Sequence, residues 1–194
     1  MSDQYIAKYC APTLAGIKTG SLFTAAYTDR EMLARELREL NGVLTRHGLR
    51  AIPLRYSKRR ALIYLYRPAA LSQDLCMPEA ASILREKGYG GTDPGLCLRR
   101  LIRQFRETDE FPHEIGLFLS YPPEDVRGFM ENPHRGYKCV GFWKVYGDRE
   151  RAERTFTRYR RCTEAFCRAT ATGKRLDNLI VGTKQPAVGH TNNI

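Results

Sequence analysis

The chain has 194 residues, enough to bury one sizeable hydrophobic core, and we therefore expect a single domain. Its 32 Lys and Arg outnumber its 21 Asp and Glu, and the resulting net charge of +11 favours anionic partners over cationic ones. No stretch reaches the roughly 20 apolar residues of a membrane span, and the N-terminus lacks the pattern of a secretion signal, so we expect a cytoplasmic protein without membrane contact.

The first third of the chain predicts a strand, a helix and a β-hairpin. Residues 21–27 are β-prone, and Thr28 with Glu31 has the spacing of a capping box that starts a helix. Gly48 is placed to end that helix. Leucines recur on one of its faces at helical spacing: Leu33, Leu37, Leu40 and Leu44. Residues 50–67 predict a hairpin, and the proline in its first arm indicates an edge strand.

The middle of the chain predicts three helices joined by short loops. Pro68, Pro78 and Pro94 stand where a proline is tolerated in a first helical turn. Asp93 is placed to cap the third helix. The glycine-rich loop before it is not a phosphate-binding loop, because no Gly-Lys-Ser/Thr sequence follows.

The last part of the chain predicts two strands that are each followed by a helix. The first strand, at residues 114–121, carries a continuous apolar run of the kind found in strands covered on both faces. The second strand spans residues 137–146. The helix after it is the longest in the chain, with Asp148 as its cap and Gly173 at its end.

This order of elements predicts an α+β or α/β fold with a mixed β-sheet of about five strands covered by helices. We expect one domain over residues 1–173. Residues 174–194 are expected to form a polar, flexible C-terminal tail.

Cys10 is the most interesting of the six cysteines. None of the six forms a Cys-x-x-Cys pair, so no metal is predicted, and the sequence points to no particular cofactor. Cys10 lies in a polar, turn-prone stretch that we expect to be outside regular structure, with Lys8 nearby. A neighbouring cation lowers a thiol pKa and raises its reactivity, whereas a small buried core residue is the alternative interpretation.

His113 and Glu114 form a second candidate site. The pair could act as a general base with its orienting carboxylate, or His113 could activate the Cys10 thiol across the fold. The polar entrance to a buried strand explains the same residues equally well. Cys10, His113 and Glu114 are thus the candidate catalytic residues.

Arginines opposite the apolar face of the last helix predict an anion-binding stripe. Its candidate residues are Arg151, Arg154, Arg158 and Arg161. A solvated helix face is the alternative, and no RNA-binding aromatic motif or helix-turn-helix pattern supports a nucleic-acid partner. An acidic protein or an anionic small molecule would fit the same charge.

Three segments together resemble one protein family. They are CAPTLAGIKTGSLF, HEIGLFLSYPPEDVRGF, and YKCVGFWKVYGD with a following helix that ends in YRRCT. They are similar to a bacterial family of unknown function, DUF3793, over about residues 5–165. The resemblance implies no reaction, cofactor or site residue.

Two classes of function follow from the sequence, and whether the protein is an enzyme stays open. The first is small-molecule binding or thiol-dependent catalysis that uses Cys10. The alternative is a non-catalytic binding or regulatory module whose basic helices meet an acidic protein or nucleic acid. Selective alkylation of Cys10 would favour the first class, and steeply salt-dependent polynucleotide binding would favour nucleic acid.

Overall fold

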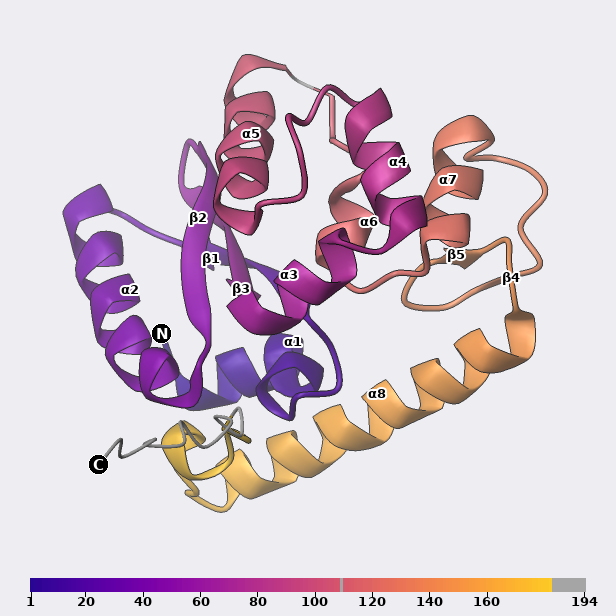
Figure 1. Ribbon diagram of the computed structural model, residues 1–194. Helices are drawn as coiled ribbons and strands as arrows, with labels where there is room; N and C mark the ends of the chain where they lie inside the picture. Colours follow the sequence, from indigo (N-terminus) through magenta and orange to yellow (C-terminus); the bar gives the residue numbers. More distant parts are fainter. Residues whose placement is uncertain (109, 183–194) are drawn as a thin grey trace, which may run out of the picture.

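The computed structural model describes residues 1–108 and 110–182, in which helices pack on both faces of a small antiparallel sheet (Figure 1). The helices are α1 (Asp3–Leu14), α2 (Arg30–Leu44), α3 (Pro68–Leu75), α4 (Pro78–Glu86), α5 (Pro94–Glu107), α6 (Ile115–Phe118), α7 (Pro123–Glu131) and α8 (Arg149–Ala171). The strands are β1 (Gly20–Ala26), β2 (Arg50–Ser57), β3 (Arg60–Tyr66), β4 (Cys139–Val140) and β5 (Lys144–Val145). Two short 3-10 helices are η1 (Thr45–His47) and η2 (Leu176–Asn178).

The main sheet has three strands in the order β1-β3-β2, and both pairs are antiparallel. β2 is an edge strand, which confirms the prediction from Pro53, and a bulge follows that proline. β4 and β5 pair only with each other. The expectation of α and β elements is therefore confirmed, but the predicted mixed sheet of about five strands is replaced by a three-stranded sheet and a two-stranded ribbon.

The main sheet separates two hydrophobic cores, because successive side chains of a strand point to opposite faces. Phe23 and Ile63 pack with α1 and α2 on one face. Leu22 and Tyr64 pack with α3, α4, α5 and α6 on the other face. Any two residues assigned to these different cores therefore lie on opposite sides of the sheet.

The helix predicted after residue 28 forms as α2, with a different cap. The Asp29 carboxylate, rather than the Thr28 hydroxyl, accepts hydrogen bonds from the backbone N–H groups of Glu31 and Met32. Gly48 ends the following 3-10 turn with a φ of 75°, which favours glycine. The predicted inward leucines Leu33, Leu37 and Leu44 are buried, and Leu40 is partly buried.

The prediction of a strand at residues 114–121 is wrong, because this segment forms the short helix α6 and a turn. The backbone N–H groups of Leu119 and Tyr121 both donate to the carbonyl of Gly116. Ser120 follows with a φ of 58°, a left-handed conformation that ends the helix. The apolar run is buried as expected, and a short apolar run suits a buried helix as well as a buried strand.

The strand predicted at residues 137–146 forms instead as the hairpin of β4 and β5. Gly141 lies in the connecting turn, where a Cβ atom would approach the Phe156 ring of α8 to 2.2 Å. Close packing of the hairpin on α8 thus requires glycine at this position. From its Asp148 cap, α8 extends along one side of the molecule to α1 (Figure 1).

The segment that follows α8 packs back onto the sheet core. Leu176 and Ile180 are buried with the side chains of α1 and α2, and the Val181 N–H donates to the Leu14 carbonyl at 3.0 Å. The polar tail predicted from residue 174 therefore begins with a packed segment, and residues 183–194 lie outside the described residues. Within the described ranges no helix is long and apolar enough to cross a membrane.

Candidate functional site

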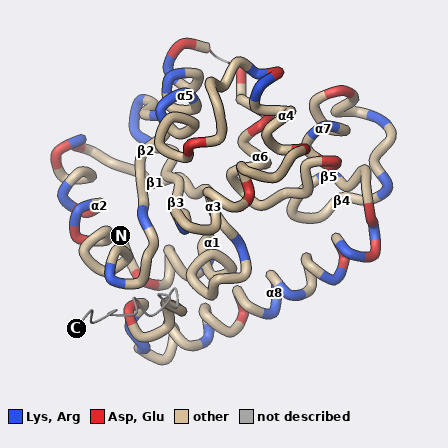
Figure 2. Tube along the Cα trace, in the orientation of Figure 1, with Lys and Arg blue, Asp and Glu red and all other residues tan. Residues whose placement is uncertain are grey.

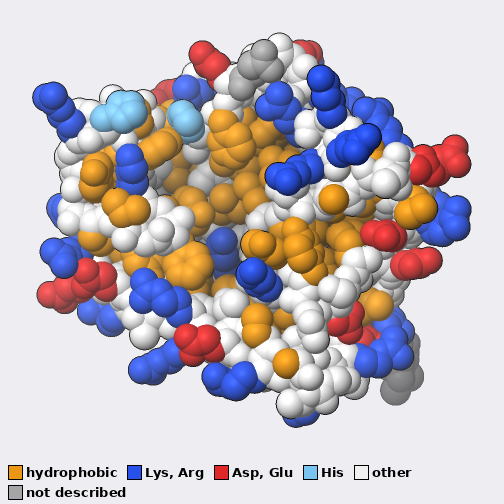
Figure 3. All heavy atoms as spheres, turned by 180° about the vertical axis from the view of Figure 1, so that it is seen from behind, with side chains coloured by type: hydrophobic (Ala, Val, Ile, Leu, Met, Phe, Trp, Pro, Cys, Tyr) orange, Lys and Arg blue, Asp and Glu red, His pale blue; other side chains and the backbone are white. Residues whose placement is uncertain are grey.

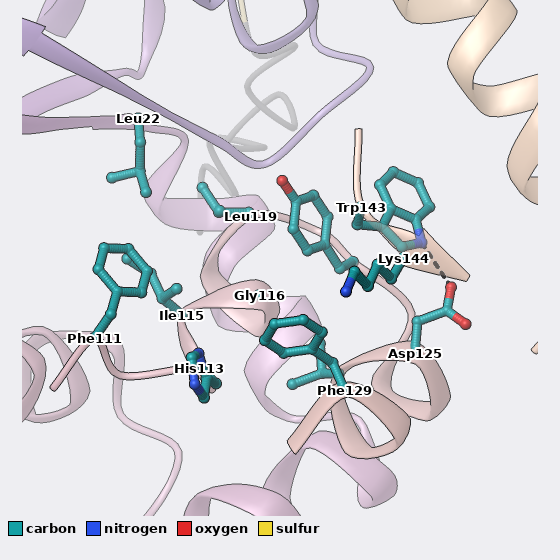
Figure 4. Close-up of a pocket in the computed structure, with 12 residues that line it drawn as sticks. Leu22, Phe111, His113, Ile115, Gly116, Leu119, Asp125, Phe129, Trp143 and Lys144 are labelled. Carbon is teal, nitrogen blue, oxygen red and sulfur yellow. Dashed lines mark hydrogen bonds between the residues drawn. The ribbon is translucent and has the colours of Figure 1, made fainter. Parts of the chain in front are cut away.

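A cavity of about 500 Å³ lies between the main sheet, α6, α7 and β5. Most of its lining side chains are aliphatic or aromatic, and they come from β1, from the segment around α6, from α7 and from the β4–β5 hairpin (Figure 4). The polar lining residues besides Tyr121 are His113, Asp125 and Lys144. Apolar walls with a few polar groups are typical of small-molecule sites.

The face of the molecule seen from behind is hollowed (Figure 3). Hydrophobic side chains gather in the hollow, and Lys, Arg and His side chains stand along its border (Figure 3). Exposed apolar surface bordered by polar groups marks binding sites more often than it marks inert surface.

Stacked aromatic rings form one wall of the cavity. The Tyr121 and Trp143 rings stack with their centroids 4.7 Å apart, and Phe156 of α8 meets Trp143 edge-on at 4.6 Å. Across the cavity, the His113 imidazole meets the Phe129 ring edge-on at 4.9 Å. These packed rings hold the cavity walls in place without a ligand.

Asp125 fixes this arrangement from the first turn of α7. One oxygen of its buried carboxylate accepts a hydrogen bond from the Trp143 indole N–H at 2.7 Å. The other oxygen accepts from the backbone N–H groups of Tyr146 and Gly147, both at 2.7 Å. Three donors thus compensate the charge of this carboxylate, and its role is to anchor the hairpin and the Trp143 ring.

Lys144 brings a cation to the cavity. Its ammonium donates to the Pro133 carbonyl at 2.6 Å. It also lies 5.7 Å from the centroid of the Phe129 ring and 4.9 Å from that of Tyr137. The rings and the carbonyl hold the ammonium without neutralising its charge, so it can still attract an anion.

The prediction that Cys10 lies outside regular structure is wrong. Cys10 belongs to α1 and is completely buried beside Phe23 and Ile63. Burial raises the pKa of its thiol well above the ordinary value, which favours the protonated, less nucleophilic form of the sulfur. Proline at position 12 suggested a turn, but the last turn of α1 accommodates it.

The structure does not bring the three candidate catalytic residues together. His113 lines the cavity on the face of the sheet opposite Cys10. The Glu114 carboxylate is buried and accepts a hydrogen bond from the Tyr89 hydroxyl at 3.1 Å. A carboxylate that orients His113 would instead accept a hydrogen bond from the imidazole. Burial, and then the Glu114 charge, raise the pKa of Tyr89 well above its usual range.

The four predicted anion-binding arginines are exposed on α8, where acidic residues stand among them (Figure 2). Arg154 pairs with Glu150 one helical turn away at 3.5 Å, and Arg158 donates to the Ile17 carbonyl at 3.3 Å. Their binding of an anion stays a prediction. Within residues 1–108 and 110–182, no group of three or more His, Cys, Asp and Glu side chains could hold a metal ion.

Sequence reasoning missed the residues that shape the cavity, namely Tyr121, Asp125, Phe129, Trp143 and Lys144. The signals available were weak: Trp143 is the chain's single tryptophan, and Asp125 follows a Pro-Pro helix start. Neither signal shows that α7 and the hairpin meet in space, which the contacts of Asp125 establish.

Comparison with known proteins identifies the family of the chain and nothing closer. A search of curated proteins and a search of solved structures both find no match. A family model described as "Protein of unknown function (DUF3793)" matches residues 6–180. This range includes all the helices and strands described above, except the start of α1. The chain therefore belongs to the DUF3793 family.

Proposed function

We propose that this protein binds a small molecule with an apolar, preferably aromatic body and an anionic group in the cavity between the sheet, α6, α7 and β5. The observation that carries the proposal is the cavity itself: about 500 Å³, walled by stacked rings, with a lysine at its lining. This volume lies within the ordinary range of small-molecule sites.

The walls favour an apolar body. Tyr121, Phe129 and Trp143 offer ring faces and edges, and Leu22 and Ile115 add aliphatic surface from β1 and α6. Burying apolar ligand surface against such walls contributes about 25 cal/mol per Å² before the costs of binding. Planar ligands gain further from offset or edge-on contact with the rings.

The charges favour an anionic group. Asp125 is the carboxylate in the lining, and three hydrogen bonds already compensate it. The Lys144 ammonium has no carboxylate partner among the residues that the structure describes. The net charge of +11 adds a long-range attraction for anions.

The first test uses 1-anilinonaphthalene-8-sulfonate, an aromatic anion whose emission rises in apolar sites. Trp143 is the chain's only tryptophan and lines the cavity, so bound dye should quench its emission by energy transfer. We expect saturable binding with such transfer by the folded protein. Dye emission that never saturates, or that rises without quenching of Trp143, would contradict the proposal.

The second test separates the charge from the apolar body by pairing Lys144→Met with Lys138→Met. Each lysine donates to one backbone carbonyl, and the two belong to the same hairpin region, but only Lys144 lines the cavity. Lys144→Met should weaken binding of the sulfonate dye about tenfold, or about 1.4 kcal/mol. Lys138→Met should change it less than about twofold.

N-Phenyl-1-naphthylamine, which has the same aromatic body without the sulfonate, provides the ligand control. Its affinity should change less than about twofold in Lys144→Met, because an uncharged ligand gains little from the ammonium. Equal loss of both dyes would mean that the substitution disturbs the cavity walls, and the anionic part of the proposal would then be wrong.

A further inference from the structure

Lys18 stands out from the other lysines in how its ammonium is surrounded. It lies in the loop between α1 and β1, 5.5 Å from the centroid of the Tyr121 ring and 5.9 Å from that of Tyr159. Tyr121 is part of the cavity wall. No hydrogen bond or ion pair reaches the ammonium from any residue in the described part of the chain.

The amine nitrogen is nevertheless not completely enclosed. Among the described residues, Arg100 Nε is the one fully enclosed side-chain nitrogen or oxygen without a partner. Lys18 Nζ also lacks a partner and is not enclosed in this way, and the residue as a whole is half-buried. The amine therefore keeps some contact with solvent although two aromatic rings lie close to it.

The loop that carries Lys18 is fixed on both sides of it. The Ile17 N–H donates to the Pro12 carbonyl, and the Ile17 carbonyl accepts from Arg158. The Thr19 N–H donates to Ser120 Oγ at 2.8 Å, and its hydroxyl donates to the Asp74 carboxylate at 2.6 Å. These bonds preset the position of Lys18, as a reactive side chain requires.

We propose that the Lys18 amine forms a reversible imine with an aldehyde whose apolar body lies against Tyr121 in the cavity. The amine lone pair attacks the carbonyl carbon and forms a carbinolamine. This adduct then loses the carbonyl oxygen with two hydrogens as water, which leaves a C=N bond. The step needs no oxidant or reductant. The inference rests on the proposed function in one respect, because it requires the cavity to hold the body of the aldehyde.

The chemistry of the amine supports this step. Burial lowers the pKa of Lys18 to about 8, against an ordinary value near 10.5, because the rings replace water around the ammonium. At neutral pH the neutral, nucleophilic fraction is then larger by about two orders of magnitude than for an ordinary lysine. Lysines desolvated in apolar surroundings are the usual imine-forming residues of proteins.

The test traps the imine with cyanoborohydride at neutral pH, using 2-naphthaldehyde as the probe, and locates the secondary amine by peptide mass mapping. Lys8 is the matched control, because its ammonium also lies over a tyrosine ring, Tyr9 at 5.5 Å, but on an exposed helix face. We expect labelling of Lys18 at least about tenfold faster than of Lys8. Lys18→Arg, which keeps the cation, should abolish this label and leave Lys8 labelling unchanged.

Equal labelling of Lys18 and Lys8 by 2-naphthaldehyde would overturn the inference. Propanal, an aldehyde without an aromatic body, separates its failure from that of the proposed function. Fast labelling of Lys18 by both aldehydes without dye binding would support imine formation at Lys18 but refute the cavity as the site that holds the aldehyde's body. Saturable dye binding with unselective labelling would support the cavity ligand and refute the imine.

Discussion

Asp125→Ala is expected to lower the free energy of unfolding by about 3–5 kcal/mol, because three N–H donors would lose a buried anionic acceptor. The loss falls on the hairpin, whose Trp143 indole and backbone at Tyr146 and Gly147 would be left without partners. Urea unfolding followed by circular dichroism measures the change. Trp143 emission in the native protein should also shift to the red as its indole meets water.

Asp148→Ala is the matched control for this substitution. Asp148 is exposed and caps α8, where its carboxylate accepts one hydrogen bond from the Arg151 N–H at 2.9 Å. Its loss should cost about 1 kcal/mol, the usual value of a helix cap. If Asp125→Ala cost no more than Asp148→Ala, the hairpin would not depend on the buried carboxylate, and the cavity wall would need another explanation.

Arg67→Met is expected to destabilise the protein by about 3–4 kcal/mol. The buried guanidinium donates to the carbonyls of Thr13, Leu14 and Val181, at 2.7, 2.8 and 2.6 Å. Methionine keeps most of the apolar stem but leaves these carbonyls without their donors. Burial of the cation is itself unfavourable and lowers the pKa of Arg67. This cost offsets part of the gain from the hydrogen bonds, so the substitution loses less stability than the three bonds alone would imply.

The effect of Arg67→Met should concentrate where the end of α1 meets the segment after α8. Hydrogen exchange of the Val181 amide, which donates to Leu14, should accelerate more than exchange of amides within β3. Arg127→Met is the control, because Arg127 forms a two-bond pair with Glu86 on the surface and should cost less than about 1 kcal/mol. Equal losses in the two variants would contradict a special role for Arg67.

Local sequence signals predicted much of the secondary structure. Leucine periodicity predicted α2, although Asp29 caps it rather than the predicted Thr28, and α5 begins after the predicted Asp93 cap. α3, α4 and α7 begin at prolines, as expected of prolines in a first turn. The hairpin of β2 and β3 and the edge position of Pro53 were also predictable. In each case the information lies within a few neighbouring residues, because caps, turns and the helical repeat are local effects.

The family and the mixed α and β character of the fold could also be predicted from residue patterns along the chain. The conformation of residues 114–121 and the arrangement of the site depend on tertiary packing. An apolar run can be buried as a strand or as a helix. Here the run forms the helix α6, in which Gly116 has no side chain and so leaves room for the Val126 side chain of α7. The cavity joins β1 to α6, α7 and β5, and β1 and β5 lie more than a hundred residues apart along the chain. Such contacts depend on packing between elements, so a local residue pattern does not predict them. The same packing buries Cys10 and places Lys18 beside two aromatic rings.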